Sequence, residues 1–147
     1  MSKFDDLHRI GQSIWYDNIQ RDHLLDGTIQ QLIESGMISG ITSNPSIFKK
    51  AIAESDMYEH SIRNMAWAGM SGKAIYEQLV IEDIQHAADL LYPLYQQTEG
   101  NDGYISLEVN PGLAQDSSAT LTEAQRLWRL VERPNLMIKI PATEAGL

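Results

Sequence analysis

The chain alternates between short apolar runs and longer stretches in which apolar residues recur at helical spacing. The short runs lie at 13–18, in about five residues that end before Asn44, at 104–109 and at 136–140. Their β-branched and aromatic residues, closed by Gly, Asn or Pro, are typical of strands, although the run at 13–18 is a weak case because it is short. Strands that alternate with helices imply parallel βα units whose sheet is covered by helices. We therefore expect four βα units.

Three helical regions separate and follow these strands. The first, 21–36, places its leucines and isoleucines at helical spacing and ends at Gly36. The second, 46–98, is long enough for two or three helices, and Ser71 is the expected N-cap of the longest one. Because Gly and Pro disfavour helix interiors, breaks are expected within it at Gly69, Gly72 and Pro93.

The third helical region lies at about 121–132 and begins with the capping-box match Thr120-x-x-Glu123. Thr143 to Leu147 would open a further helix if the chain continued. Together the elements predict an α/β fold of the TIM (β/α)8-barrel type, with the single domain 1–147 forming about the first four βα units of a partial barrel.

The composition is that of a soluble globular domain. Of 147 residues, 43% are apolar and 21% charged. The net charge is -9 and only 11 scattered Lys and Arg are present, which argues against a nucleic-acid partner. The absence of cysteine excludes disulfides and cysteine-based metal sites. No apolar run approaches about 18 residues and no signal peptide is recognisable, so we expect a cytoplasmic protein with no membrane span.

Four polar residues stand near the carboxyl ends of the expected strands: Asp17, Asn44, Glu108 and Lys139. Asp17 is separated from Asn44, and Glu108 from Lys139, by about 30 residues, the length of one βα unit. In an α/β barrel the carboxyl ends of the strands form one face, where catalytic groups from several strands converge. We therefore expect the four side chains to form one site.

Lys139 interrupts an apolar strand, so its ammonium is expected to be poorly hydrated. Burial favours the neutral amine, which is the form that attacks a carbonyl to give a Schiff base, an electron sink for cleavage of the adjacent C–C bond. Glu108 and Asp17 are the carboxylates placed for proton transfer, directly or through a water, and Asn44 could bind a substrate hydroxyl. Each residue also has a structural alternative: Lys139 simply extends to solvent, Glu108 is a solvated strand end, Asp17 a turn residue and Asn44 a helix N-cap.

Two other motifs carry little weight. The segment from Ser46 to Lys49 fits the S-x-x-K pattern of serine acyl-enzymes but lacks the accompanying motifs. Glu82, Asp83 and His86 share one face of a predicted helix, where a solvated surface is the stronger interpretation than a metal site.

The sequence resembles the transaldolase family through four motifs that occur in order along nearly the whole chain. They are "GQSIWYDNI", "GITSNPSIFKKAI", "SLEVNP" and "NLMIKIPAT". The resemblance implies a cytoplasmic enzyme of the non-oxidative pentose phosphate pathway, with no metal or organic cofactor. Such enzymes move a dihydroxyacetone unit from sedoheptulose 7-phosphate to glyceraldehyde 3-phosphate, giving erythrose 4-phosphate and fructose 6-phosphate.

By the same resemblance, Lys139 forms the Schiff base and Glu108 acts through a catalytic water. Asp17 is the acid and base at the hydroxyl of the cleaved carbon, and Asn44 binds the dihydroxyacetone moiety. A full barrel has about 250 residues, so the donor-site and phosphate-binding residues of later strands are expected to lie outside this chain. The open edges of the half sheet favour a homo-oligomer. The rival interpretations are a lyase similar to fructose-6-phosphate aldolase, and a barrel fragment or assembly module without catalysis.

Overall fold

A computed structural model describes residues 3–147, except for the side chain of Asp5. Its sheet has four parallel strands in the order β1-β2-β3-β4, which confirms the four expected βα units. The strands are β1 (Trp15–Tyr16), β2 (Gly40–Thr42), β3 (Tyr104–Glu108) and β4 (Leu136–Lys139). They are shorter than the apolar runs, and β1 has only two residues.

Helices precede and connect the strands. The α-helices are α1 (Lys3–Arg9), α2 (Arg21–Leu25), α3 (Thr28–Glu34), α4 (Pro45–Glu54), α5 (Glu59–Trp67), α6 (Gly72–Gln97) and α7 (Ser117–Val131). Three short 3-10 turns are η1 (Asp56–Tyr58), η2 (Pro111–Leu113) and η3 (Glu144–Gly146). The helix expected to open at Thr143 is therefore a single turn.

The helix predicted at 21–36 is two helices, α2 and α3. Gly27 lies between them with φ of 87°, a left-handed conformation that a residue without Cβ adopts at no steric cost. The break predicted at Pro93 does not occur, because α6 continues to Gln97. Leu91, two residues before Pro93, is fully buried, so packing against the sheet outweighs the hydrogen bond that proline cannot donate.

The predicted N-terminus of α7 is also wrong. The helix begins at Ser117, and the side chain of Asp116 accepts a hydrogen bond from the Ala119 amide. Thr120 is already inside the helix, and its hydroxyl donates to the carbonyl of Leu113. The prediction for Ser71 is confirmed, because its hydroxyl accepts from the Ala74 amide at the start of α6.

One face of the sheet packs against helices. Ile41, Ile105 and Leu136 are neighbours in register on β2, β3 and β4, and all three are buried. The α6 residues of the same cluster are Val80, Ile81, Ile84, Ala87, Ala88 and Leu91. Burial of each large apolar side chain contributes roughly 1.5–3 kcal/mol, so this layer stabilises the half sheet.

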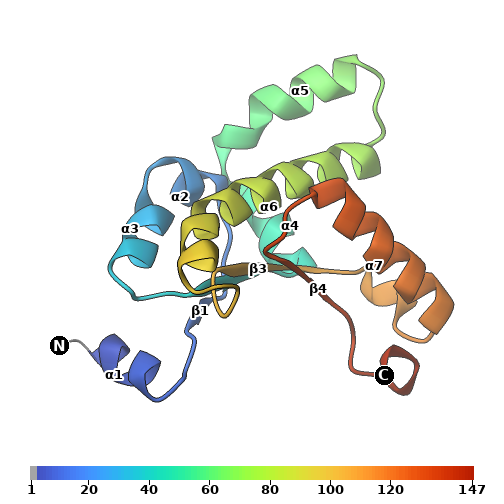
Figure 1. Cartoon of the computed structure of the whole chain (residues 1–147). Coiled ribbons are helices and arrows are strands. Elements are labelled where there is room, and N and C mark those ends of the chain that lie inside the picture. Colours follow the sequence, from blue (N-terminus) through green and yellow to red (C-terminus); the bar gives the residue numbers. More distant parts are fainter. Residues whose placement is uncertain (1–2) are drawn as a thin grey trace.

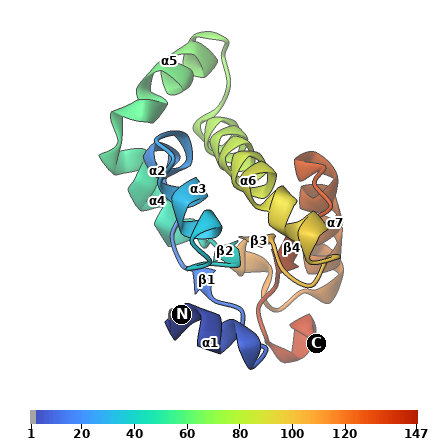
Figure 2. The ribbon, with the colours of Figure 1, turned by 60° about the vertical axis from the view of Figure 1, so that its left-hand side comes forward.

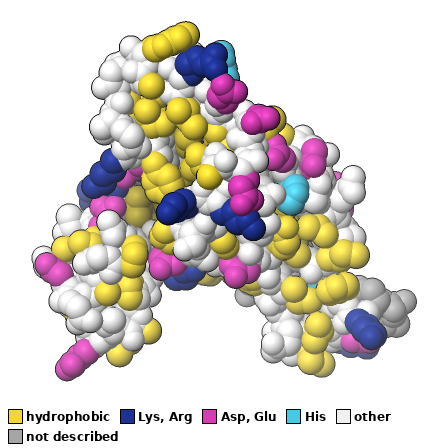
Figure 3. Space-filling view, turned by 180° about the vertical axis from the view of Figure 1, so that it is seen from behind, with side chains coloured by type: hydrophobic (Ala, Val, Ile, Leu, Met, Phe, Trp, Pro, Cys, Tyr) yellow, Lys and Arg dark blue, Asp and Glu magenta, His cyan; other side chains and the backbone are white. Residues whose placement is uncertain are grey.

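Within residues 3–147, no helix lies across the opposite face of the sheet (Figures 1 and 2). From behind, the lower half of the molecule is hollowed between the lobe that holds α1 and the lobe that holds the C-terminal residues (Figure 3). Met137, which faces this side by alternation with buried Leu136, is 43% exposed. The fold is thus an open parallel sheet covered on one face, consistent with part of a TIM barrel.

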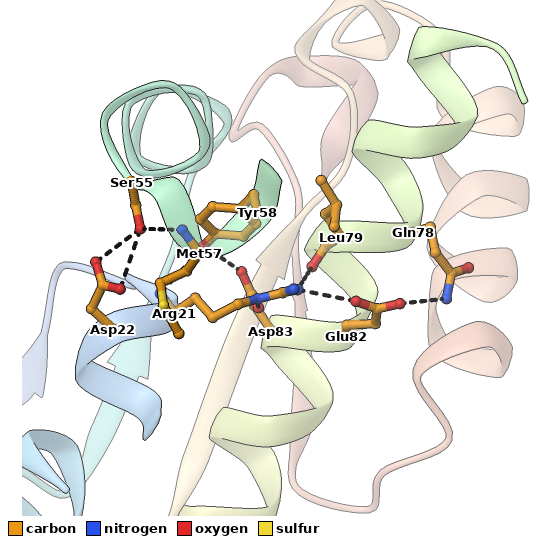
Figure 4. Close-up of polar contacts among 9 residues, drawn as sticks. All are labelled: Arg21, Asp22, Ser55, Met57, Tyr58, Gln78, Leu79, Glu82 and Asp83. Atoms are coloured by element: carbon orange, nitrogen blue, oxygen red, sulfur yellow. Dashed lines mark hydrogen bonds and ion pairs between the residues drawn. The ribbon is translucent and has the colours of Figure 1, made fainter. Parts of the chain in front are cut away.

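A buried polar cluster joins the start of α2 to η1 and α6 (Figure 4). The Arg21 guanidinium donates to Asp83 at 2.6 Å and to Glu82 at 3.1 Å. The Tyr58 hydroxyl donates to the second oxygen of Asp83 at 2.7 Å, and its ring lies 4.5 Å from the Arg21 guanidinium. Burial raises the pKa of Tyr58, so its hydroxyl stays protonated and remains a donor. The cluster fixes the segment that follows β1.

Candidate active site at the carboxyl edge of the sheet

Lys139 and Glu108 lie side by side at the carboxyl ends of β4 and β3. The two residues are partners in the strand register, so their side chains leave the sheet on the same face. The ammonium of Lys139 lies 3.1 Å from a carboxylate oxygen of Glu108. The structure therefore brings together two of the four residues that the sequence assigned to one site.

The ammonium of Lys139 also contacts β2. It donates to the carbonyl of Ser43 at 2.9 Å and lies 3.4 Å from the hydroxyl oxygen of Thr42. The Ser106 hydroxyl in turn donates to that of Thr42 at 3.0 Å. These contacts from the neighbouring strands fix the direction of the lysine side chain.

Thr42 and Ser106 were missed in the sequence. They lie two residues before Asn44 and Glu108 respectively, and alternate residues of a strand share a face. Polar residues at these positions of otherwise apolar strands are the signal that could have found them.

The expectation of a poorly hydrated ammonium at Lys139 is wrong for this chain. The side chain is 41% exposed, because it extends over the uncovered face of the sheet. Glu108 is more enclosed, with 23% of its side chain exposed. What holds the lysine is a set of oxygen acceptors and not an apolar pocket.

Asn44 is the N-cap of α4. Its side-chain oxygen accepts hydrogen bonds from the amides of Ser46 and Ile47, both at 3.0 Å, and Pro45 occupies the first helical position. The N-cap alternative is therefore correct. This role uses the oxygen and leaves the amide nitrogen, a donor, for another partner.

Asp17 follows β1 and is exposed. A Cβ added to Gly40 would meet the Trp15 ring at 2.5 Å. The Trp15 ring therefore lies over β2 on the open face of the sheet. Asp17 is two residues further along and shares that face by alternation. It is not among the contacts of Lys139, which are Thr42, Ser43 and Glu108.

A cavity of about 770 Å³ adjoins the site between α4, α6 and α7. Asn44 and Glu108 contribute to its wall, whereas Lys139 and Asp17 do not. Its floor is apolar and consists of Phe48, Val80, Ile81, Leu107 and Leu127. The cavity is thus on the helix side of the strand ends, and the lysine is on the open side.

The other motifs have structural roles. Glu82 and Asp83 bind Arg21, and within residues 3–147 no cluster of three or more His, Asp and Glu could hold a metal ion. The Ser46 amide donates to Asn44 at the start of α4. No helix in the described part of the chain is long and apolar enough to cross a membrane.

Comparison with known proteins identifies similar sequences over nearly the whole chain. Residues 14–147 match the Transaldolase/Fructose-6-phosphate aldolase family. The chain is 49% identical over 142 residues to a transaldolase of Thiobacillus denitrificans, which covers 97% of this chain and 40% of the relative. It is 47% identical over 146 residues to a transaldolase of Thermobifida fusca, and this match covers 99% of this chain and 40% of the relative. The chain therefore spans about 40% of the length of these relatives.

Proposed function

Because the chain belongs to the transaldolase/fructose-6-phosphate aldolase family, we propose that it carries the Schiff-base half of a transaldolase site. The reaction transfers a dihydroxyacetone unit from sedoheptulose 7-phosphate to glyceraldehyde 3-phosphate in the pentose phosphate pathway of the cytoplasm. The observation that carries the proposal is the pair of Lys139 and Glu108, 3.1 Å apart at the carboxyl edge of a parallel sheet.

Lys139 is the nucleophile. Its ammonium must lose a proton before it attacks, and the Glu108 carboxylate is within reach to accept that proton, directly or through a water. The amine adds to the substrate carbonyl, whose oxygen leaves as water, and a protonated imine remains. When the bond between the α and β carbons of the imine breaks, its electron pair forms a double bond between the α carbon and the imine carbon, which gives an enamine bound to Lys139.

Asp17 and Asn44 act on the substrate. Asp17 takes the proton from the hydroxyl of the carbon that leaves as an aldehyde, and it returns a proton when the enamine adds to the acceptor aldehyde. The free amide nitrogen of Asn44 donates to a hydroxyl of the dihydroxyacetone unit. Their positions at the ends of β1 and β2 support both assignments.

We further propose that residues 1–147 are one domain, the N-terminal part of a barrel. The edges at β1 and β4 each expose backbone donors and acceptors, and we propose that a second copy of the chain covers them. The residues that hold the phosphate lie outside this chain.

A coupled assay tests the proposed activity. Purified protein is given fructose 6-phosphate with and without erythrose 4-phosphate, and glyceraldehyde 3-phosphate is measured with a dehydrogenase. We expect product only when the acceptor is present, and no product from the Lys139→Met variant. Lys50→Met, at an exposed site on α4, is the matched control and should keep the wild-type rate.

Two results would contradict the proposal. Product without acceptor would identify a lyase similar to fructose-6-phosphate aldolase. No product under either condition from folded protein would identify a fragment or assembly module without catalysis.

A further inference from the structure

The cavity between α4, α6 and α7 has the size and lining of a small-molecule site. Its volume of about 770 Å³ is within the range of roughly 300–1,000 Å³ that is usual for ligand pockets. The floor is apolar, and polar groups from α6 and α7 surround it. A flat apolar molecule could bury most of its surface there.

The carboxylates in the wall of this cavity already have partners. Arg126 donates to both oxygens of Glu77 and to both oxygens of Glu123, so four of the five N–H groups of its guanidinium are engaged. The hydrogen bonds from Arg126 hold the pKa of Glu123 below its usual value, so it stays ionised and paired. Glu108 is paired with Lys139. Little acceptor capacity remains for a ligand.

The groups that remain free in the wall are donors. Within the described residues, the Tyr76 hydroxyl and the Lys73 ammonium form no hydrogen bond, although the charge of Lys73 also helps to hold the pKa of Glu123 below its usual value. Burial raises the pKa of Tyr76, which keeps its hydroxyl protonated. A ligand that accepts hydrogen bonds or carries negative charge matches this set.

We propose that this cavity binds an amphipathic anion, with a flat apolar body on the floor formed by Phe48 and Leu127 and its anionic group at Lys73. The ligand lies behind Glu108, on the helix side of the strand ends and away from the Lys139 amine. The cavity shares Asn44 and Glu108 with the proposed sugar-phosphate site but contains neither Lys139 nor Asp17, and its existence does not depend on the proposed activity.

Fluorescence titration with two probes tests this site. The anion 8-anilinonaphthalene-1-sulfonate should bind one molecule per chain, and about tenfold more tightly than the uncharged N-phenyl-1-naphthylamine, a ratio that corresponds to about 1.4 kcal/mol. Lys73→Gln should remove the difference between the probes. Ala74→Trp, which places an indole in the cavity from the first turn of α6, should abolish the binding of both.

Ala53→Trp is the matched control, because Ala53 is exposed on α4 and does not line the cavity, and this variant should bind as the wild type does. Undiminished binding by Ala74→Trp would place the probes elsewhere, such as on the open face of the sheet, and would overturn the proposal. Equal affinity of the wild type for the two probes would overturn the proposal that the cavity prefers an anion. If neither probe binds to the wild type, the proposal of a ligand site in this cavity would be overturned.

Discussion

Charged side chains are held in two different ways in this molecule. Lys139 meets a carboxylate, a carbonyl and a hydroxyl on an open face, where water still reaches it. Arg21 and Asp83 are enclosed, with side-chain exposures of 13% and 3%. An exposed pair can lose a proton or exchange partners at low cost, as catalysis requires, whereas a buried pair cannot be broken without leaving a charge uncompensated.

Replacement of Asp83 by Asn should therefore destabilise the protein strongly. Of its two carboxylate partners, Arg21 would keep only Glu82, which is 40% exposed. We expect a loss of about 3 kcal/mol in the free energy of unfolding, at the lower end of values for broken buried pairs. Urea denaturation followed by circular dichroism measures the change. Asp89→Asn breaks the exposed pair with Arg133 and should cost at most about 1 kcal/mol. Equal losses in the two variants would contradict the structural role of the buried cluster.

The helices and strands follow the hydrophobic periodicity of the sequence where local residues alone determine the structure. All four apolar runs contain a strand, and the carboxyl ends of β3 and β4 brought Glu108 beside Lys139 as predicted. Local signals failed where a contact distant in sequence decides the outcome. Pro93 does not end α6 because the helix is held against the sheet, and Lys139 is exposed because it extends over the open face of the sheet.

The turn from α6 into β3 gives a prediction at this scale. Gly103 has φ of 83°, and an added Cβ would lie 2.3 Å from the Tyr95 nitrogen of α6. Gly69 has φ of 82°, but an added Cβ meets no atom within 4 Å. Gly69→Ala should cost about 1 kcal/mol for the left-handed backbone. Gly103→Ala should cost roughly 1–3 kcal/mol more, because helix and strand must separate.

Thermal and urea unfolding of the two glycine variants measure the difference. Similar stabilities would show that the close approach of α6 to β3 is not required. A larger loss for Gly69→Ala would contradict the described geometry of the α5–α6 turn.

The whole molecule is a half sheet with one covered face, two open edges and a site at its carboxyl end. A second copy could cover the edges and shield the open face, which would also exclude water from Lys139. We expect the chain to self-associate. The sequence predicts self-association because four strands leave the sheet with open edges. It does not predict which residues form the contact between two copies, because hydrophobic periodicity does not specify how two molecules fit together.

Light scattering coupled to size exclusion should detect oligomers at tens of micromolar. Met137→Glu puts a charge on the open face and should shift the protein to monomers. Met57→Glu is the matched control, because Met57 is 46% exposed on η1 and Met137 is 43% exposed on β4. A monomeric wild type, or equal association of the two variants, would contradict association through the open face.

Borohydride trapping with fructose 6-phosphate tests most directly whether Lys139 is a Schiff-base lysine. Reduction converts an imine to a stable amine, so peptide mass spectrometry finds the modified residue. We predict an adduct of the size of dihydroxyacetone on Lys139, none on the exposed Lys50 and none in the Lys139→Met variant. An adduct spread over the exposed lysines, or no adduct on folded protein, would contradict the account.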